Sequence, residues 1–261
     1  MNRVLLSIGP ITIYWYSVTM LLAVLTGIYL AIRESKKQGM YSFMSDLITY
    51  AIIFGIIGAR LYYVIFNFDN YKYDLLSIFK IWEGGIAIYG AIIGGLIAIT
   101  YLAKKRNQSI IKTTDIIAPG LLLAQSIGRW GNFFNSEAYG SVVTLDFLKS
   151  LKIPNFIIEG MHIDGNYYHP TFLYESIWCL LGFIILIIIR NLTKRKQGIM
   201  TYSYFIWYGV GRLFIEGLRT DSLYLGTYRI SQIVSIILII LGIIGIIISI
   251  TKNLKVKNKL K

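Results

Sequence analysis

The sequence is poor in charged residues and in the residues that build disulfides and metal centres. Only 15% of its 261 residues are charged, whereas a soluble domain carries about a quarter. A single cysteine, Cys179, excludes an intrachain disulfide and a cysteine-based metal cluster. Two histidines, His162 and His169, without clustered ligands give no metal-site signal. Apolar residues make up 56% of the chain, a balance that favours a membrane protein.

Apolar runs long enough to cross a bilayer recur along the whole chain. A helix needs about 20 largely apolar residues to span a hydrocarbon core of about 30 Å. About seven segments meet this requirement: 12–32, 47–67, 86–103, 115–134, 172–190, 200–217 and 230–250. The sequence therefore predicts an all-α polytopic membrane protein, with one integral membrane domain over 1–261. The longest outer loop is expected at 135–171, with a hairpin turn at Asp164-Gly165.

Lysine and arginine are unevenly divided between the two sets of loops. Most of the 26 basic residues fall on one side, together with the C-terminal tail 252–261. The positive-inside rule places that side in the cytoplasm and the N-terminus outside. The net charge of +13 is therefore explained by membrane orientation and by anionic lipid headgroups. No basic stripe with interleaved aromatics predicts nucleic-acid binding.

Small residues at helical spacing predict close packing between spans. Gly90 and Gly94 form a GxxxG pattern, and Gly55 with Ala59 forms a similar pair.

Three arginines fall inside predicted spans, and all three lie toward the outer side: Arg60, Arg129 and Arg212. An arginine at a span centre costs about 2.5–3.5 kcal/mol on insertion scales. Carboxylates accompany them toward the outer boundary: Glu83, Glu137, Glu175 and Glu216. Snorkelling to the headgroups explains Glu83 or Glu175 singly. A shared polar cavity in the outer leaflet explains the whole group better, because the three arginines lie on three different helices together with carboxylates and asparagines. The inner halves of the spans are almost uniformly apolar.

The densest polar segment is Gly128–Gly140, and a second one is Gly209–Arg219. A helical first segment puts Arg129, Asn132 and Ser136 on one face. A helical second segment does the same for Arg212, Glu216 and Arg219. Arg212 and Glu216 are compatible both with a structural ion pair and with substrate contact. Two guanidinium groups near the headgroup level form a phosphate clamp, which predicts an anionic phospholipid as ligand.

The run GRWGNFFNSEAYG over 128–140 resembles the signature of the bacterial prolipoprotein diacylglyceryl transferases, G-R-x-G-N-F-x-N-x-E-x-x-G, and every fixed position matches. The resemblance extends over nearly the whole chain through five further matches: Tyr14-Trp15-Tyr16, Gly58-Ala59-Arg60, the run 84–90, the run 169–175, and Gly211-Arg212 with Glu216.

The resemblance implies transfer of the diacylglyceryl group of phosphatidylglycerol to the lipobox cysteine thiol of a bacterial preprolipoprotein. The products are a thioether-linked lipid and glycerol 1-phosphate, and no metal or organic cofactor is expected. The expected location is the bacterial cytoplasmic membrane, with the active site toward its extracytoplasmic leaflet. The resemblance makes Arg129 and Arg212 the phosphate contacts and carries over Asn132, Glu137 and Gly140.

Further candidates complete the predicted site. Tyr16 and Glu216 also carry over from the resemblance, and Arg60 and His169 are expected near the lipid. One departure leaves the proton acceptor open, because many relatives have histidine where this chain has Tyr89. Tyrosine has an unperturbed pKa of about 10 and is a poor base near neutrality. Its hydroxyl is still suited to orienting the phosphate or the thiol. Glu137, Glu216 and His169 are alternative bases.

Two other functions compete with this interpretation. A transporter or channel for an anionic solute also needs membrane arginines, but it predicts charges that reach both sides of the bilayer. A metal-dependent phosphatidyl transferase needs clustered aspartates for Mg²⁺, and the sequence contains no such cluster.

Overall fold

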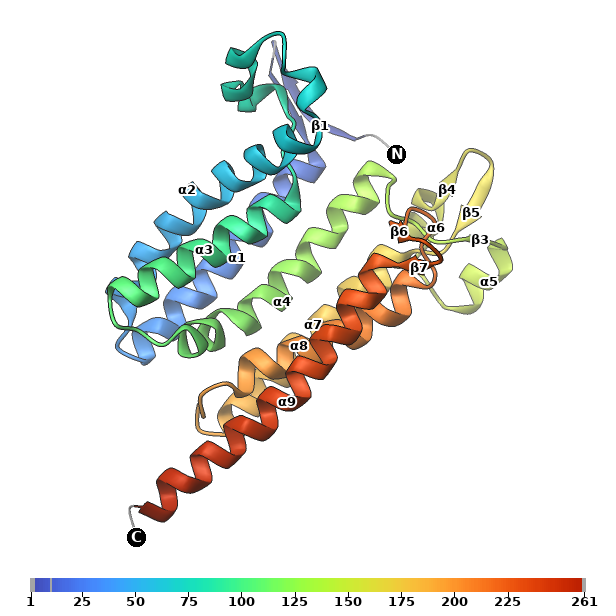
Figure 1. Cartoon of the computed structure of the whole chain (residues 1–261). Helices are drawn as coiled ribbons and strands as arrows, with labels where there is room; N and C mark the ends of the chain where they lie inside the picture. The colour runs from blue at the N-terminus through green and yellow to red at the C-terminus, as the bar shows by residue number, and fades with distance from the viewer. Residues whose placement is uncertain (1–2, 10, 260–261) are drawn as a thin grey trace. The chain divides into compact units, whose positions relative to one another are not determined.

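The computed structural model describes residues 3–9 and 11–259, and most of them are helical (Figure 1). The elements in chain order are β1 (Val4–Ile8), β2 (Ile11–Tyr14), α1 (Trp15–Lys37), α2 (Tyr41–Phe66), the 3-10 turns η1 (Phe68–Asn70), η2 (Leu75–Phe79) and η3 (Ile81–Glu83), α3 (Ile88–Lys105), α4 (Ile110–Asn135), β3 (Val142–Val143), α5 (Leu145–Ser150), α6 (Asn155–Gly160), β4 (His162–Ile163), β5 (Asn166–Tyr168), α7 (Thr171–Leu192), α8 (Ile199–Glu216), β6 (Tyr224–Leu225), β7 (Tyr228–Arg229) and α9 (Ile230–Lys259).

The predicted fold class is confirmed. Within the described residues, 6 helices are long and apolar enough to cross a membrane: α1, α2, α3, α4, α7 and residues 230–251 of α9. The predicted sixth span coincides with α8, whose 18 residues include Arg212, Glu216 and four tyrosine or tryptophan side chains that lower its hydropathy. The count of seven spans and the orientation of the termini therefore stay predictions. The first predicted span began too early, because residues 11–14 form strand β2.

The chain divides into two compact units, residues 1–30 with 114–261 and residues 31–113. The predicted single membrane domain is neither confirmed nor contradicted by this division and stays a prediction.

In the second unit, α2 and α3 pack backbone against backbone. A Cβ atom on Gly90 would lie 2.2 Å from the carbonyl oxygen of Gly58, and one on Gly94 would lie 2.0 Å from that of Phe54. Only glycine permits this approach, so the predicted GxxxG packing of Gly90 and Gly94 is confirmed. Gly55 makes an ordinary contact with α3, at 3.8 Å from the carbonyl oxygen of Ala91.

Arg60 of α2 organises the loop that joins α2 to α3. Its buried guanidinium donates to five backbone carbonyl oxygens, those of Ser77, Ile78, Lys80, Gly84 and Gly85. The two shortest bonds to the far end of the loop measure 2.7 Å to Gly84 and 2.9 Å to Gly85. One buried charge thereby satisfies backbone acceptors of both η2 and the turn before α3.

In the first unit, α7 and α8 are held together by a reciprocal pair of tryptophans. The indole nitrogen of Trp178 donates to the carbonyl oxygen of Trp207 at 2.9 Å, and that of Trp207 donates to Trp178 at 2.9 Å. The rings stack with centroids 4.4 Å apart. Gly182 and Gly211 make room, since a Cβ on either would lie 2.3 or 2.2 Å from an indole nitrogen. The pair fixes the register of two helices that run alongside each other in Figure 1.

Asp115 of α4 caps the first turn of α8. Its carboxylate accepts from the backbone nitrogens of Gly198 at 2.5 Å and Thr201 at 2.8 Å, and from the Thr201 hydroxyl at 2.7 Å. A carboxylate at a helix N-terminus satisfies free N–H groups and the helix dipole. This buried charge lies toward the predicted inner side. The expectation that inner halves are almost uniformly apolar is therefore wrong at this helix junction.

The predicted outer loop 135–171 is a small folded region. Strands β3, β5 and β4 form a sheet in that order. The turn between β4 and β5 is Asp164-Gly165, with φ values of 49° and 83°, so the predicted hairpin is confirmed. Gly140 pairs with Arg219 as an isolated antiparallel bridge, which ties this region to the segment after α8.

Candidate functional site

Three helices of the first unit bring four charged side chains together. Arg129 extends from α4, Glu175 from α7, and Arg212 and Glu216 from α8. Glu175 is the common partner: one carboxylate oxygen pairs closely with Arg129 Nε and the other with Arg212 Nη1. Arg212 uses its second terminal nitrogen for Glu216, at 2.5 Å. The structure therefore contains the predicted Arg212–Glu216 ion pair and joins it to Arg129 through Glu175.

Arg219 reaches the same cluster from outside a helix. The prediction that it continues the face of Arg212 and Glu216 is wrong, because α8 ends at Glu216. Its Nη1 nonetheless lies 3.9 Å from a Glu175 oxygen. Its other nitrogens donate to Asp221 at 2.9 and 2.7 Å. These hydrogen bonds hold the pKa of Asp221 below its usual value.

The two central arginines differ in how fully they are used. Arg212 pairs one terminal nitrogen with each of two carboxylates, and its side chain is 14% exposed. Arg129 is 24% exposed and pairs with Glu175 through Nε. Within the described part of the chain, its terminal nitrogens have one further contact, 3.5 Å to the Asn132 amide oxygen. Arg129 therefore presents an accessible donor face, whereas Arg212 is enclosed by its partners.

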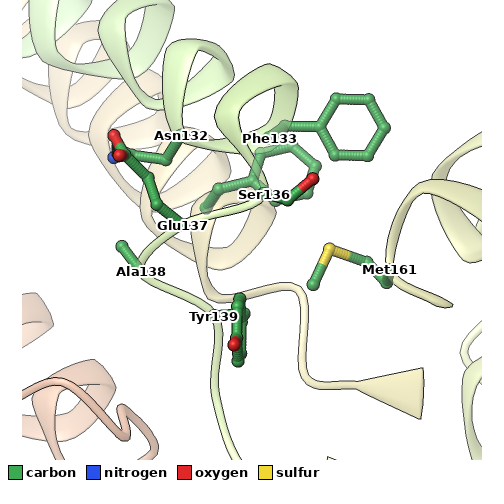
Figure 2. Close-up of a pocket in the computed structure, with 8 residues that line it drawn as sticks. Asn132, Phe133, Ser136, Glu137, Ala138, Tyr139 and Met161 are labelled. Carbon is green, nitrogen blue, oxygen red and sulfur yellow. Dashed lines mark hydrogen bonds between the residues drawn. The ribbon is translucent and has the colours of Figure 1, made fainter. Parts of the chain in front are cut away.

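The end of α4 turns Glu137 back toward its own helix. Asn132 donates to Glu137 at 2.9 Å, and Figure 2 shows the two side chains meeting. The chain leaves the helix through residues with positive φ, Ser136 at 53° and Ala138 at 57°. Ser136 thus lies past the end of α4, so the predicted shared face with Arg129 and Asn132 stops at Asn132. Non-glycine residues with positive φ carry backbone strain, which typically persists where function or packing requires it.

Figure 2 also shows the small cavity beneath this turn. Its volume of about 10 Å³ is room for about one water molecule. It is lined by Asn132, Phe133, Ser136, Glu137, Ala138, Tyr139, Met161 and Phe172. A lipid headgroup does not fit there.

Two predicted residues are placed by tight packing against glycine. The Tyr16 ring lies against Gly131, where a Cβ would come within 2.9 Å of Tyr16 Cδ2. The Tyr16 hydroxyl is close enough to Glu137 and Arg129 to interact electrostatically with both. Gly140 is enclosed, since a Cβ there would lie 2.6 Å from His169 Cβ and 2.9 Å from the Leu218 carbonyl oxygen.

His169 lies at the junction between β5 and α7. Its backbone nitrogen donates to Ser141, and its carbonyl oxygen accepts from Gly140. Its Nδ1 is 3.2 Å from the Tyr174 hydroxyl. Burial lowers the pKa of the His169 imidazole, so the ring is neutral near pH 7.

Arg60 and Tyr89 belong to the second unit. Arg60 is engaged by backbone carbonyls as described above, and Tyr89 is 48% exposed in the first turn of α3. Their predicted roles in substrate binding and proton transfer stay predictions.

Neutral polar groups continue along α4, α7 and α8 on the predicted inner side of the arginine cluster. Ser126 of α4 bonds with Ser176 of α7, and Gln125 donates to the Tyr204 hydroxyl at 3.0 Å. Thr201 of α8 lies 2.8 Å from the Thr114 hydroxyl of α4. These groups bond to one another across helix contacts, which is how polar residues join membrane helices.

The arginine cluster around Glu175 is suited to binding an anion whose charge changes during a reaction. Arginine donors fixed by ion pairs in a low-dielectric setting stabilise developing negative charge without reorganising. Sequence reasoning included Glu175 in the predicted polar cavity but gave it no role in the site, since a carboxylate at the boundary is also explained by snorkelling. The signal available was its place at the end of the matched run 169–175.

Comparison with known proteins identifies relatives over nearly the whole chain. A family model described as prolipoprotein diacylglyceryl transferase matches residues 3–248. A protein of Halalkalibacterium halodurans is 50% identical over 239 residues, which cover 91% of this chain and 82% of the relative. Proteins of Ligilactobacillus salivarius and Listeria innocua are each 50% identical over 238 residues, covering 90% and 91% of this chain and 88% and 86% of the relatives. All three are named phosphatidylglycerol–prolipoprotein diacylglyceryl transferase.

Proposed function

This chain belongs to the prolipoprotein diacylglyceryl transferase family, and on that premise we propose that it transfers the diacylglyceryl group of phosphatidylglycerol to the lipobox cysteine thiol of preprolipoproteins. The products are a thioether-linked lipid and glycerol 1-phosphate. The observation that carries the proposal is the arginine cluster around Glu175, in a chain that matches the family from residue 3 to residue 248.

The cluster suits the chemistry of this transfer. The substrate thiol loses its proton to a base, and the sulfur then attacks the glycerol carbon that bears the phosphate. The carbon–oxygen bond breaks, and its electron pair leaves with glycerol phosphate. Negative charge therefore grows on the phosphate, where Arg129 and Arg212 are proposed to bind it. The accessible face of Arg129 is the first donor that an arriving phosphate meets.

The other predicted residues fall into supporting roles. Asn132 contacts both Arg129 and Glu137, so it positions the charged groups at the end of α4. Gly140 is proposed to act through packing, because it has no room for a side chain between His169 and Leu218.

Three more groups are assigned by their surroundings. Glu216 holds Arg212, and Tyr16 is proposed to contact the lipid headgroup beside Arg129. Arg60 is proposed to act through the loop whose carbonyls it binds.

The base is a choice among four groups: Tyr89, Glu137, Glu216 and His169. Glu216 is engaged by Arg212 in an ion pair, so a role as base requires that this contact be broken. Glu137 accepts a hydrogen bond from the Asn132 amide, which leaves it available as a proton acceptor. His169 is neutral near pH 7, the form in which an imidazole accepts a proton. Tyr89 is exposed, and a tyrosine hydroxyl is in general a poor base near neutrality.

The proposed setting is the bacterial cytoplasmic membrane, with the arginine cluster toward the extracytoplasmic leaflet and the C-terminus inside. The excess of lysine and arginine in one set of loops supports this orientation. Lipobox-containing signal peptides reach the site from that leaflet, and phosphatidylglycerol reaches it laterally.

Complementation tests the proposal in cells. Expression of this chain in a bacterium depleted of its own transferase should restore lipoprotein maturation and growth. A membrane-inserted, normally expressed protein that fails to do so would contradict the proposed activity. Import of an anionic solute by such cells would instead favour a transporter.

A further inference from the structure

Glu175 fills the space between the two arginines that are proposed to hold phosphate. Its two carboxylate oxygens pair with Arg129 and with Arg212, one oxygen to each arginine. Its side chain is 7% exposed, so solvent does not compensate for the charge. A carboxylate offers two oxygens to a pair of guanidinium groups much as a phosphodiester does. Glu175 therefore occupies the position that the substrate phosphate requires.

The use of donors shows which contact must break. Arg129 can receive a phosphate on its terminal nitrogens while Nε stays paired with Glu175. Arg212 already has both terminal nitrogens on carboxylates. A phosphate that engages both arginines must therefore displace one of these carboxylates from Arg212.

Glu175 has another place to go, and Glu216 does not. Glu216 is 2% exposed, and within the described part of the chain Arg212 is the one cation in ion-pair reach of its side chain. Arg219 Nη1 already lies 3.9 Å from Glu175, just beyond hydrogen-bond range. A small rotation of the Glu175 side chain therefore exchanges Arg212 for Arg219, and the carboxylate keeps a cationic partner.

We propose that Glu175 is an internal counter-anion, which the phosphate of the lipid substrate displaces from Arg212 and which Arg219 then receives. The proposal rests on the proposed function, since it names how that site admits its substrate. Arg129, Arg212 and Arg219 are balanced by Glu175, Glu216 and Asp221. The empty site is therefore neutral, and bare cations are never exposed to the bilayer, where they are costly.

The same exchange acts on the product. Once the carbon–oxygen bond breaks, glycerol phosphate is a monoester that takes a second negative charge with a pKa of about 6. Arg129 and Arg212 hold such a group strongly. The return of Glu175 to Arg212 competes with it at the high effective concentration of an attached group, and so promotes release.

Substitution of the carboxylate by its neutral isostere tests the exchange. The variant E175Q is compared with wild type in nanodiscs, with a short-chain phosphatidylglycerol as the probe and equilibrium binding as the measurement. Without its internal competitor, E175Q should bind the probe with a Kd lower by about tenfold, equivalent to about 1.4 kcal/mol. Turnover should fall together with KM, because product leaves slowly. E159Q, which neutralises an exposed carboxylate on α6, is the matched control and should bind as wild type does.

A second variant guards against misfolding of E175Q. In E175D the charge remains, but the shorter side chain cannot bridge both arginines, so its Kd should lie between those of wild type and E175Q. If the wild-type protein transfers lipid but either variant binds the probe no more tightly than wild type does, the exchange is wrong and the proposed function still stands. A wild-type protein that neither binds the probe nor transfers lipid overturns both.

Discussion

Arg129 and Arg212 are predicted to be equally necessary for transfer but unequal for stability. The perturbation is replacement of each by glutamine, which keeps hydrogen-bonding groups but removes the charge. Both variants lose a charged donor to the phosphate. Loss of one such donor typically costs about 10²–10³ in rate. We expect the kcat for transfer to fall by about that factor in R129Q and in R212Q alike.

Stability separates the two variants because their partners differ. In R129Q, Glu175 keeps its pair with Arg212, so the expected loss is about 1.5–3 kcal/mol, the worth of one charge-assisted hydrogen bond. In R212Q, Glu216 loses the cation that pairs with it, and its side chain is 2% exposed. Removal of one partner from a buried pair costs about 3–5 kcal/mol. R212Q should therefore be the less stable variant by about 2 kcal/mol.

The assay monitors unfolding of the detergent-purified proteins by tryptophan fluorescence. Lipid transfer is measured on the same preparations. Neutralising Glu216 as well, in R212Q/E216Q, should recover part of the lost stability but none of the activity. Equal unfolding midpoints for R129Q and R212Q would refute the network of partners on which the reasoning depends.

Three further predictions concern other parts of the molecule. G140A should lower transfer at least tenfold and lower the free energy of unfolding by about 1–3 kcal/mol, as overpacking does. G95A is the control: a Cβ at Gly95 would have no atom within 4 Å, so this variant should behave as wild type in the same assays. D115N should lower stability by about 1–2 kcal/mol through the lost cap, with kcat unchanged in transfer by the folded fraction. Y89F should clearly lower the kcat for transfer, because it removes the hydroxyl that is a candidate base or hydrogen-bond donor. Full activity of Y89F would exclude both roles for the Tyr89 hydroxyl.

The sequence predicted the all-α membrane fold class because its determinants are local. Hydropathy over about 20 residues decides whether a helix spans, and the apolar runs are long. The hairpin at Asp164-Gly165 was also predictable, because an Asp-Gly pair favours a turn with positive φ at both residues, and both residues have positive φ in the structure. Helix α8 was placed correctly, although its charged and aromatic residues lower the hydropathy on which a span count depends.

The candidate site was only partly predictable, because ion pairs between helices have no sequence spacing. Arg129, Arg212 and Glu216 were selected as costly charges within spans, and the structure brings them together. Glu175 was not selected, since a carboxylate at a helix end is also explained by snorkelling. Arg219 was placed on a helix that ends three residues earlier, yet tertiary structure returns it to the same cluster.

Arg60 shows why a buried charge alone does not identify a substrate contact. From the sequence it resembles Arg129, as an arginine in the outer half of a span. In the structure its donors meet five backbone carbonyls of one loop. Only the folded loop brings these carbonyl oxygens together around one guanidinium group, so the sequence alone does not reveal that Arg60 binds them.

Mass spectrometry of a lipobox peptide incubated with the purified protein and phosphatidylglycerol tests the central claim most directly. We predict a mass gain of one diacylglyceryl group on the peptide cysteine, with release of glycerol phosphate, and loss of both signals in R129Q. An unmodified peptide from folded wild-type protein, under conditions in which a known relative modifies it, would contradict the account.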